Sequence, residues 1–298
     1  TLVSLLDVTA RYLAEKGSAS ARLDAELLLA ETLGIDQRVK LYLQYDRPMD
    51  AAELDAYRAL VKRRAGGEPV AYILGRAFFY EEELEVTPAV LIPRPATETL
   101  VEAAFERLTD VDSTRHRLAD VGTGTGAVAI AIARQRSGLR VVATEIAPEV
   151  AALARRNVAR YELSARVDVF AADLFEPLPG QLASGPEALA ALAGPFDLIV
   201  SNPPYIAEGD PRVEAAVRAY EPATALFAGA DGLSVIRRLL PAAQERLKPG
   251  GALLIEVGQG QAAAVIALAT PQGYRASPSI KDLSGIERVV VLEKPDQR

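Results

Sequence analysis

The chain has 298 residues, a formal net charge of −7 and no cysteine. This length favours two domains of roughly 150 residues each, and the absence of cysteine excludes disulfides, thiolate catalysis, zinc–thiolate sites and iron–sulfur clusters. Because the chain has one histidine, a metal site built from several histidines is excluded as well, and we expect no metal. The acidic balance does not predict a footprint for duplex nucleic acid.

Signals for membrane insertion and secretion are not evident in the sequence. No stretch approaches about 18 uninterrupted apolar residues, the length that a membrane-spanning helix needs. The first 20 residues lack a charged segment followed by an apolar core, as a secretion signal would have. We therefore expect a cytoplasmic protein without a membrane span, and the absence of cysteine fits a reducing compartment.

Residues 1–75 have the pattern of a small helical bundle. The stretch 23–30 is rich in helix-forming residues. Asp50, with Glu53 three residues later, has the spacing of a capping box at the start of another helix, which should end near the glycines at 66–67. No strand pattern occurs in this region, so we expect a separate helical domain.

Residues 76–96 change character and predict a β-hairpin that links two domains. Leu84 and Val86 alternate with acidic residues, as in a half-buried strand. A Thr-Pro turn follows, and the apolar residues 90–92 indicate a second short strand that two prolines end.

Residues 97–298 alternate between strand and helix patterns. Such alternation predicts an α/β fold, with a mostly parallel sheet covered by helices on both faces. Residues 176–195, rich in Pro, Gly and Ala, indicate an insertion or a loose loop. We predict strands at 118–121, 141–144, 167–170, 196–201, 252–257 and 288–292, and helices at 97–107, 127–134, 148–159, 233–247 and 261–269.

A glycine-rich turn follows the first of these strands. Residues 118–126 read Leu-Ala-Asp-Val-Gly-Thr-Gly-Thr-Gly, and a helix pattern comes next. Glycines allow a tight turn and close approach of a ligand. Glu145 lies about 20 residues further on, at the end of the next strand, where it can accept hydrogen bonds from both hydroxyls of a ribose. This order predicts a nucleoside cofactor site; the alternative is a turn that only connects elements.

The spacing Asp-x-Gly-x-Gly-x-Gly resembles motif I of the class I S-adenosylmethionine-dependent methyltransferases, which have a Rossmann-like fold. The resemblance implies S-adenosyl-L-methionine as cofactor and S-adenosyl-L-homocysteine as product. It implies that the methionine part is wrapped by Gly122, Thr123, Gly124, Thr125 and Gly126.

The same resemblance assigns the nucleoside part of the cofactor. Glu145 would hold the ribose, Ile146 would pack on the adenine, and Asp173 and Leu174 would flank it. Asp173 as a solvated turn residue is an alternative. Asp120 has two interpretations of equal weight: a cofactor ligand, or only a cap for the glycine turn.

Strand 196–201 ends in Ser-Asn-Pro-Pro-Tyr, with Asn202, Pro203, Pro204 and Tyr205 after the strand's last residue. The carboxyl ends of parallel strands form the ligand crevice of such a sheet. Two prolines fix the backbone, so that the Pro203 carbonyl and the Asn202 side-chain carbonyl can accept one hydrogen each from a planar –NH2 group. Tyr205 offers an aromatic face for stacking. The alternative is a turn with a packed tyrosine.

An amide or exocyclic amine is a poor nucleophile because its lone pair is delocalised. Acceptance of both hydrogens returns electron density to the nitrogen, and positioning and desolvation can then contribute much of the rate. Asn-Pro-Pro-Tyr resembles the signature of methyltransferases that act on planar nitrogens in DNA, ribosomal RNA or protein glutamine. We therefore predict Asn202, Pro203 and Tyr205 as catalytic, residues 202–205 as the substrate-binding segment, and Asn202 as a cofactor contact too.

Nearly the whole chain resembles one family, the bacterial peptide chain release factor glutamine methyltransferases (HemK/PrmC type). The resemblance implies methylation of the side-chain amide N5 of glutamine in the Gly-Gly-Gln motif of class I release factors. We also expect a monomer that does not bind nucleic acid directly. The stretches that carry the resemblance are 23–28, 63–75, 91–98, 202–206, 220–222, 225–226, 232–233, 256–258 with Gln261, and 281–283 with Gly285 and Arg288.

By this resemblance the chain divides into a helical substrate-recognition domain (1–75), a β-hairpin linker (76–96) and a methyltransferase domain (97–298). A stabilising cap is the alternative role for the helical domain. Arg63 and Arg64 would contact the partner or form a solvated helix end, and His116 should lie on a surface loop.

One position departs from the family pattern. Ala96 stands where the family usually has an acidic residue, and we expect the loss of only a peripheral contact. Arg94 and Glu98, on either side, would contact the substrate or form an ion pair that holds the linker to the catalytic domain.

Three other functions stay open at this point. A nucleic-acid exocyclic-amine methyltransferase, acting on guanine N2 of ribosomal RNA or adenine N6 of DNA, would share the tetrapeptide. A nicotinamide dehydrogenase is disfavoured by the glycine spacing, and a non-enzymatic binding module by the intact Asn-Pro-Pro-Tyr.

Overall fold

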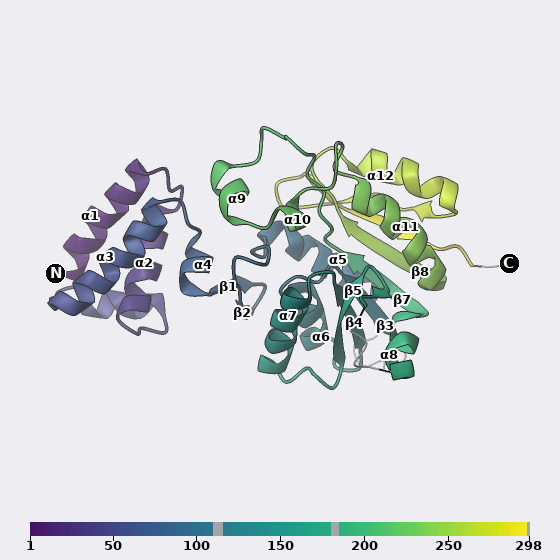
Figure 1. Ribbon diagram of the computed structural model, residues 1–298, viewed down its shortest axis with the longest axis horizontal. Helices are drawn as coiled ribbons and strands as arrows, with labels where there is room; N and C mark the ends of the chain where they lie inside the picture. The colour runs from purple at the N-terminus through teal and green to yellow at the C-terminus, as the bar shows by residue number, and fades with distance from the viewer. Residues whose placement is uncertain (110–115, 180–184, 297–298) are drawn as a thin grey trace. The chain divides into compact units, whose positions relative to one another are not determined.

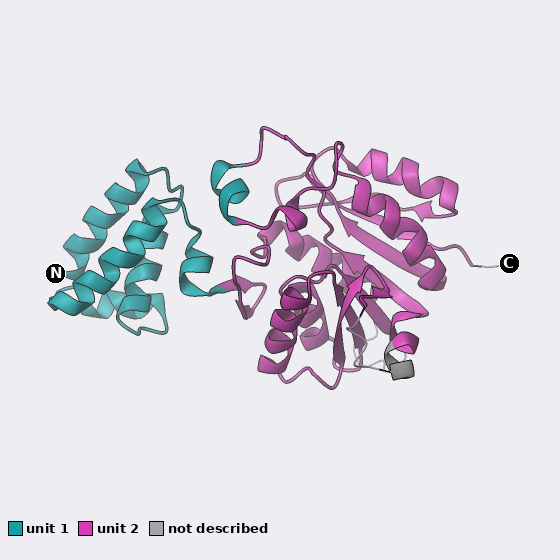
Figure 2. Ribbon diagram, viewed as in Figure 1, with its two compact units in different colours: residues 1–76, 214–220 teal, residues 77–213, 221–298 magenta. Residues whose placement is uncertain are grey.

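The computed structural model describes residues 1–109, 116–179 and 185–296. Within them the chain forms two compact units (Figure 2). Unit 1 holds residues 1–76 and 214–220, and unit 2 holds residues 77–213 and 221–298.

Unit 1 is helical, as the sequence predicts. Leu6, Leu28 and Tyr57 belong to its buried core, and the Tyr57 hydroxyl donates to the Ala25 carbonyl at 3.1 Å. Three short elements were not predicted: η1, α4 and α9. Its elements are α1 (Leu2–Glu15), α2 (Ala21–Thr32), η1 (Arg38–Gln44), α3 (Ala51–Ala65), α4 (Val70–Leu74) and α9 (Ala215–Tyr220).

The predicted capping box at the start of α3 is confirmed. The Asp50 side chain accepts from the Glu53 N–H at 2.8 Å, and the Glu53 side chain accepts from the Asp50 N–H at 3.1 Å. Two N–H groups at the start of α3, which would otherwise lack partners, are therefore satisfied.

The hairpin is formed by β1 (Arg76–Phe79) and β2 (Glu82–Glu85), which turn at Tyr80. The prediction of a strand at 90–92 is wrong. Those residues follow a turn in which the Val90 N–H donates to the Thr87 carbonyl at 3.1 Å. The hairpin turn was not predicted because Tyr80 occupies it. Its φ of +56° is a conformation that glycine or asparagine usually adopts.

In unit 2 the described residues form a sheet in the order β10-β11-β8-β7-β3-β4-β5-β6, with β9 on β11. The strands β3, β4, β5, β7 and β8 run parallel, whereas β11 is antiparallel to β8. The six longer strands correspond to the predicted ones. The strands are β3 (Arg117–Val121), β4 (Arg140–Glu145), β5 (Val167–Asp173), β6 (Glu176–Pro177), β7 (Phe196–Ser201), β8 (Leu247–Glu256), β9 (Arg275–Ala276), β10 (Ile280–Lys281) and β11 (Glu287–Glu293).

Helices cover both faces of this sheet (Figure 1). Successive residues of a strand point to opposite faces, so Leu118 packs with α5, α6 and α7, and Ala119 packs with α11 and α12. The helices of unit 2 are η2 (Pro95–Thr97), α5 (Glu98–Arg107), α6 (Ala127–Gln135), α7 (Pro148–Arg160), α8 (Gly185–Leu192), α10 (Ala223–Leu226), α11 (Ser234–Arg246), α12 (Ala262–Ala269) and η3 (Thr270–Gln272).

The prediction of an insertion or loose loop at 176–195 is wrong for part of that range. Residues 176–177 form β6, and residues 185–192 form α8, whose Leu192 joins the core beneath α11. Residues 180–184 lie outside the described residues. Alanine-rich composition is compatible with a helix as well as with a loop, which explains the error.

We expect Asp50→Ala to lower the unfolding free energy of unit 1 by about 1 kcal/mol, because the first turn of α3 loses its cap. Urea denaturation followed by the helical circular dichroism signal measures this. Asp55→Ala is the matched control: Asp55 is an exposed residue of α3 whose Arg58 contact is 3.4 Å, so a change of less than about 0.5 kcal/mol is expected. Equal losses in the two variants would contradict the capping role.

Candidate active site

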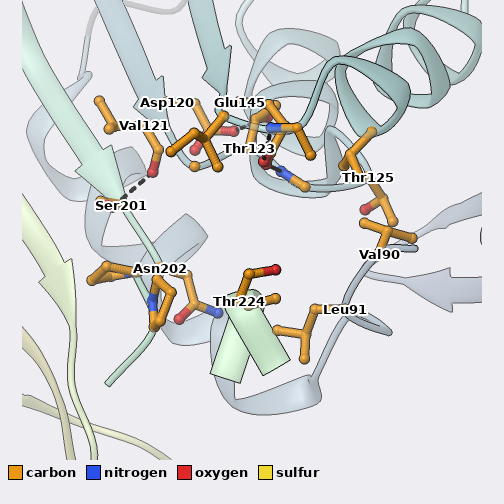
Figure 3. A pocket seen from close by; sticks show the side chains of 18 of the residues that line it. Val90, Leu91, Asp120, Val121, Thr123, Thr125, Glu145, Ser201, Asn202 and Thr224 are labelled. Atoms are coloured by element: carbon orange, nitrogen blue, oxygen red, sulfur yellow. Dashed lines mark hydrogen bonds between the residues drawn. The ribbon is translucent and has the colours of Figure 1, made fainter. Parts of the chain in front are cut away.

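The parallel strands of unit 2 end at one edge of the sheet, and a cavity of about 400 Å³ lies there (Figure 3). Asp120 and Glu145 lie on one side of this cavity, and Asn202 and Thr224 lie on the other. The predicted site residues that line it are Gly122, Thr123, Gly124, Thr125, Glu145, Ile146, Asp173, Leu174, Asn202, Pro203 and Pro204. Gly126 and Tyr205 lie outside its lining.

The glycine turn between β3 and α6 needs its glycines. Gly122, Gly124 and Gly126 have φ values of +74°, +56° and +85°, a region in which a side chain is strained. The N–H groups of Gly122 and Thr123 both donate to the Thr144 carbonyl at 2.9 Å, which joins the turn to β4. The turn is therefore a rigid part of the cavity wall.

Asp120 ties this turn to the following helix. Its Oδ2 accepts from the Thr123 hydroxyl at 2.6 Å and from the Ala129 N–H at 3.2 Å. Asp120 is buried, and burial raises the pKa of its carboxyl from 3.8 to about 6. These bonds are those of a cap for the turn, and Asp120 also belongs to the cavity lining.

Glu145 ends β4 with both carboxylate oxygens held by backbone. Oε2 accepts from the Gly124 N–H at 3.0 Å, and Oε1 accepts from the Ala147 N–H at 3.1 Å. Burial raises the pKa of Glu145, and these hydrogen bonds oppose that shift. Each carboxylate oxygen has a second lone pair, so the group can still accept two hydroxyl donors from the cavity. The next residue, Ile146, exposes 53% of its surface and adds an apolar wall.

Asp173, at the end of β5, forms an ion pair and is therefore not merely a solvated turn residue. Its Oδ2 lies 2.6 Å from Nη2 of Arg238 on α11, which also lines the cavity. Leu174 follows with φ +55°. Arg238 was not predicted, because a pair between β5 and a helix 65 residues later leaves no local sequence pattern.

Asn202 follows β7, and its amide orientation is set by a neighbour. Nδ2 donates to Oγ1 of Thr97, a buried residue, at 3.0 Å. This bond uses one of the two N–H groups of the amide and fixes its orientation, and Oδ1 remains as an acceptor for a donor in the cavity. Thr97 was not predicted as a site residue, although it lies in the stretch 91–98 that carries the family resemblance.

Tyr205 is mostly buried beside the cavity. Its hydroxyl donates to Oε1 of Glu256 at 3.3 Å, and its carbonyl accepts from Nε2 of Gln261 at 2.9 Å. Burial and the nearby Glu256 carboxylate raise the pKa of the Tyr205 hydroxyl. Stacking of this ring on a substrate stays a prediction.

The interpretation of Arg94 and Glu98 as an ion pair is wrong. Arg94 pairs with Glu221, whose Oε2 also accepts from the Ile92 N–H at 3.3 Å. Glu98 instead accepts from the Tyr80 N–H at 3.1 Å. The Arg94–Glu221 pair therefore joins the segment that carries Leu91 and Pro93 to the segment that carries Thr224, and both line the cavity.

The other residues marked by the sequence lie away from the cavity. Ala96 is outside its lining. Arg63 pairs with Glu68 at 2.8 Å, and Arg64 pairs with Asp24 at 2.7 Å, both within unit 1. His116 is partly exposed just before β3, with Nδ1 3.6 Å from Asp197.

Two further searches covered the described ranges 1–109, 116–179 and 185–296. In these residues no group of histidine, aspartate and glutamate side chains could hold a metal ion. No helix among them is long and apolar enough to cross a membrane.

Comparison with known proteins identifies the family. Residues 4–75 match the PrmC N-terminal domain, and residues 95–230 match the methyltransferase small domain. A relative from Geobacter sulfurreducens, named release factor glutamine methyltransferase, is 44% identical over 291 residues, which cover 97% of this chain and 95% of that protein. This chain belongs to the release factor glutamine methyltransferase family. A relative from Rhodopirellula baltica with the same name is 39% identical, and the match covers 99% of this chain and 96% of that protein.

A solved structure agrees with this fold. The hMettl16 catalytic domain, in complex with the MAT2A 3′UTR hairpin 6, has a TM-score of 0.53 at 15% identity, over 85% of this chain and 95% of that one. The predicted fold class, a class I methyltransferase fold with a mostly parallel sheet and an N-terminal helical region, is confirmed.

The raised pKa of Asp120 predicts a pH dependence of stability. Between about pH 4 and pH 6 the folded protein keeps a proton on Asp120 that the unfolded chain has released, so the unfolding free energy falls as the pH rises. Asp120→Asn removes this titration, and its amide oxygen can still accept from Thr123. We expect the stability of the wild type relative to the variant to fall by up to about 3 kcal/mol over this window.

Urea denaturation of both proteins from pH 4 to pH 8 measures the effect. A stability difference that is the same at every pH would contradict the buried, protonated carboxyl.

Proposed function

We propose that this protein transfers a methyl group from S-adenosyl-L-methionine to the amide N5 of the glutamine in the Gly-Gly-Gln motif of class I release factors. The observation that carries the proposal is the amide of Asn202, whose nitrogen donates to Thr97, so that Oδ1 is left to accept from a donor in the cavity that Asn202 and Pro203 line. The names of the full-length relatives support the release factor as substrate.

The residues of the cavity fit the proposed cofactor. Its volume of about 400 Å³ is within the range of small-molecule sites. The two oxygens of Glu145 suit the neighbouring hydroxyls of a ribose. Ile146 would offer an apolar surface to the adenine, and Asp173 and Leu174, which line the same cavity, would flank it. The glycine turn, residues 122–126, would face the methionine part. When bound, S-adenosyl-L-methionine supplies a methyl group on a positively charged sulfur, which is strongly electrophilic.

The protein's part in the reaction is to hold and activate the amide. Oδ1 of Asn202 and the carbonyl of Pro203 would each accept one N–H of the glutamine side chain, and Pro204 and Tyr205 would complete the substrate-binding segment. Acceptance of both hydrogens localises the lone pair on N5. The two prolines hold these acceptors in place, so the amide is oriented before reaction and little reorganisation remains.

The wider setting follows from this proposal. Residues 1–75 would recognise the release factor, the hairpin at 76–96 would link them to the methyltransferase domain at 97–298, and the enzyme would act as a cytoplasmic monomer. Nucleic acid would not be a direct partner.

The proposal is tested with methyl-labelled S-adenosyl-L-methionine and purified class I release factors, wild type and with the glutamine of Gly-Gly-Gln replaced by alanine. Label on the wild-type factor alone is expected. Ribosomal RNA and DNA are the comparison substrates in the same assay. Label on either nucleic acid and on no release factor would overturn the proposal in favour of an exocyclic-amine methyltransferase.

Replacement of Glu145 is expected to weaken cofactor binding. Glu145→Ala removes two charge-assisted acceptors, so we expect the dissociation constant of S-adenosyl-L-methionine to rise by about 10- to 100-fold. Isothermal titration calorimetry measures this. Glu149→Ala, which removes an exposed carboxylate outside the cavity lining, is the matched control. Equal affinity of Glu145→Ala and wild type would refute the ribose assignment.

Asn202→Ala is expected to affect chemistry rather than cofactor binding. We expect methyl transfer to fall by at least about 100-fold while cofactor affinity changes by less than about tenfold, because a positioned contact to the reacting amide is lost. Single-turnover transfer and calorimetry on the same sample separate the two effects. Unchanged turnover would exclude Asn202 from the reaction.

A further inference from the structure

A buried carboxyl group lies behind the substrate-binding segment. Glu256 ends β8, which pairs with β7 so that Ile255 is opposite Ser201. Glu256 is therefore placed beside Asn202, one residue beyond the paired positions. Its exposed fraction is 0%, and burial of a carboxyl costs free energy that only hydrogen bonds or a charge partner can offset.

Glu256 holds Tyr205 directly. Oε1 accepts the Tyr205 hydroxyl at 3.3 Å, whereas Oε2 is buried and has no hydrogen-bond partner among the described residues. Burial raises the pKa of Glu256, against the opposing effect of the Thr97 and Tyr205 hydroxyls and the charge of Arg288.

Thr97 connects Glu256 to Asn202. Oγ1 of Thr97 accepts from Nδ2 of Asn202, so the hydroxyl hydrogen of Thr97 must find another acceptor. Its hydroxyl is close enough to the Glu256 carboxyl to influence the pKa of that group. Glu256 is thus hydrogen-bonded to Tyr205 at one end of the tetrapeptide 202–205 and lies near Thr97, which orients Asn202 at the other.

The backbone of Tyr205 is held from the other side. Gln261 donates to its carbonyl at 2.9 Å and accepts from the Gly258 N–H at 2.9 Å. A Cβ at Gly232 would lie 2.2 Å from the Tyr205 carbonyl oxygen, and a Cβ at Gly258 would lie 3.2 Å from the ring. Hydroxyl, ring and carbonyl of Tyr205 are therefore all constrained.

We propose that Glu256 is a positioning residue for methyl transfer, which holds Tyr205 directly and Asn202 through Thr97. This inference rests on the proposed function, because it concerns the same site. Glu256 does not line the cavity, so it acts through its neighbours and not on the substrate. Geometry rather than negative charge is the property that matters, and an uncharged side chain of the same shape should replace it.

The test compares Glu256→Gln with Glu256→Leu. Gln keeps a side-chain oxygen that can accept from the hydroxyls of Tyr205 and Thr97, whereas Leu offers no acceptor. We expect Glu256→Leu to lower kcat by about 10- to 100-fold, with the KM for the release factor and the affinity for the cofactor changed by less than about threefold. Glu256→Gln should keep kcat within about threefold of wild type.

Two controls separate positioning from general destabilisation. Glu82→Gln removes another buried carboxylate of unit 2, which pairs with Arg134 at 2.8 Å away from the cavity, and should leave kcat unchanged. Tyr205→Phe combined with Glu256→Leu should lower kcat by less than the product of the single effects, because both changes remove the same hydrogen bond.

Should Glu256→Leu fail to fold, Glu256→Asp replaces it. This variant withdraws the carboxyl by one methylene, and the same loss of kcat is expected.

A readout independent of the substrate uses tyrosine labelled with ¹³C at Cζ. The Tyr205 resonance, identified from its absence in Tyr205→Phe, should shift in Glu256→Leu (or, where that variant does not fold, in Glu256→Asp) and stay in Glu82→Gln. Wild-type kcat in that Glu256 variant would overturn the inference. Failure of the wild-type enzyme to methylate any release factor would refute the proposed function instead, and the resonance would then decide: an unmoved Tyr205 signal overturns the positioning role, and a shifted one supports it.

Discussion

The parallel alignment of five strands is the constraint on which the site depends. Because β3, β4, β5, β7 and β8 all end at one edge of the sheet, the residues that follow them meet there although they are far apart in the chain. Asp120, Glu145, Asp173, Asn202 and Glu256 come from the ends of different strands. No one of these segments could form the cavity alone, so the fold is the means by which five short polar segments become one site.

Carboxyl groups with little access to water connect the segments at this edge. Asp120 binds the glycine turn to α6, Glu145 binds it to the end of β4, and Glu256 holds Tyr205. In each case burial raises the pKa of the carboxyl, and donors from a loop oppose the shift. Loops normally move more than strands, and these hydrogen bonds give the site the rigidity that orientation of an amide requires.

The parts of this structure that the sequence predicted are those with a local pattern. Strand and helix periodicity predicted the six longer strands of the sheet, and the glycine spacing with Glu145 predicted one wall of the cavity. The hairpin turn was missed because Tyr80 stands where glycine is usual. The strand expected at 90–92 did not form, because Val90 and Leu91 line the cavity instead of pairing with another strand.

Contacts across long sequence separations were beyond local reasoning. Arg94 pairs with Glu221, 127 residues away, and Thr97 accepts from Asn202, 105 residues away. Neither pair can be predicted from sequence spacing, because the two residues of each pair are brought together only by the folded chain. The family resemblance marked the stretches 91–98, 220–222 and 256–258 without a reason for them, and the structure supplies contacts for all three.

Substrate selection involves both the segment 202–205 and the residues around it. In the function proposed above, the Asn-Pro-Pro-Tyr segment would offer acceptors to a planar –NH2 group, and such a group occurs on glutamine, adenine, cytosine and guanine alike. The segment therefore selects the kind of nitrogen and cannot select the polymer that carries it. Around it, the lining contributes mainly apolar side chains, the glycine turn and few charged groups, with Arg94 already paired to Glu221 and Arg238 to Asp173. The two arginines of this lining are therefore already neutralised by carboxylates, whereas binding of a phosphate backbone depends on cations.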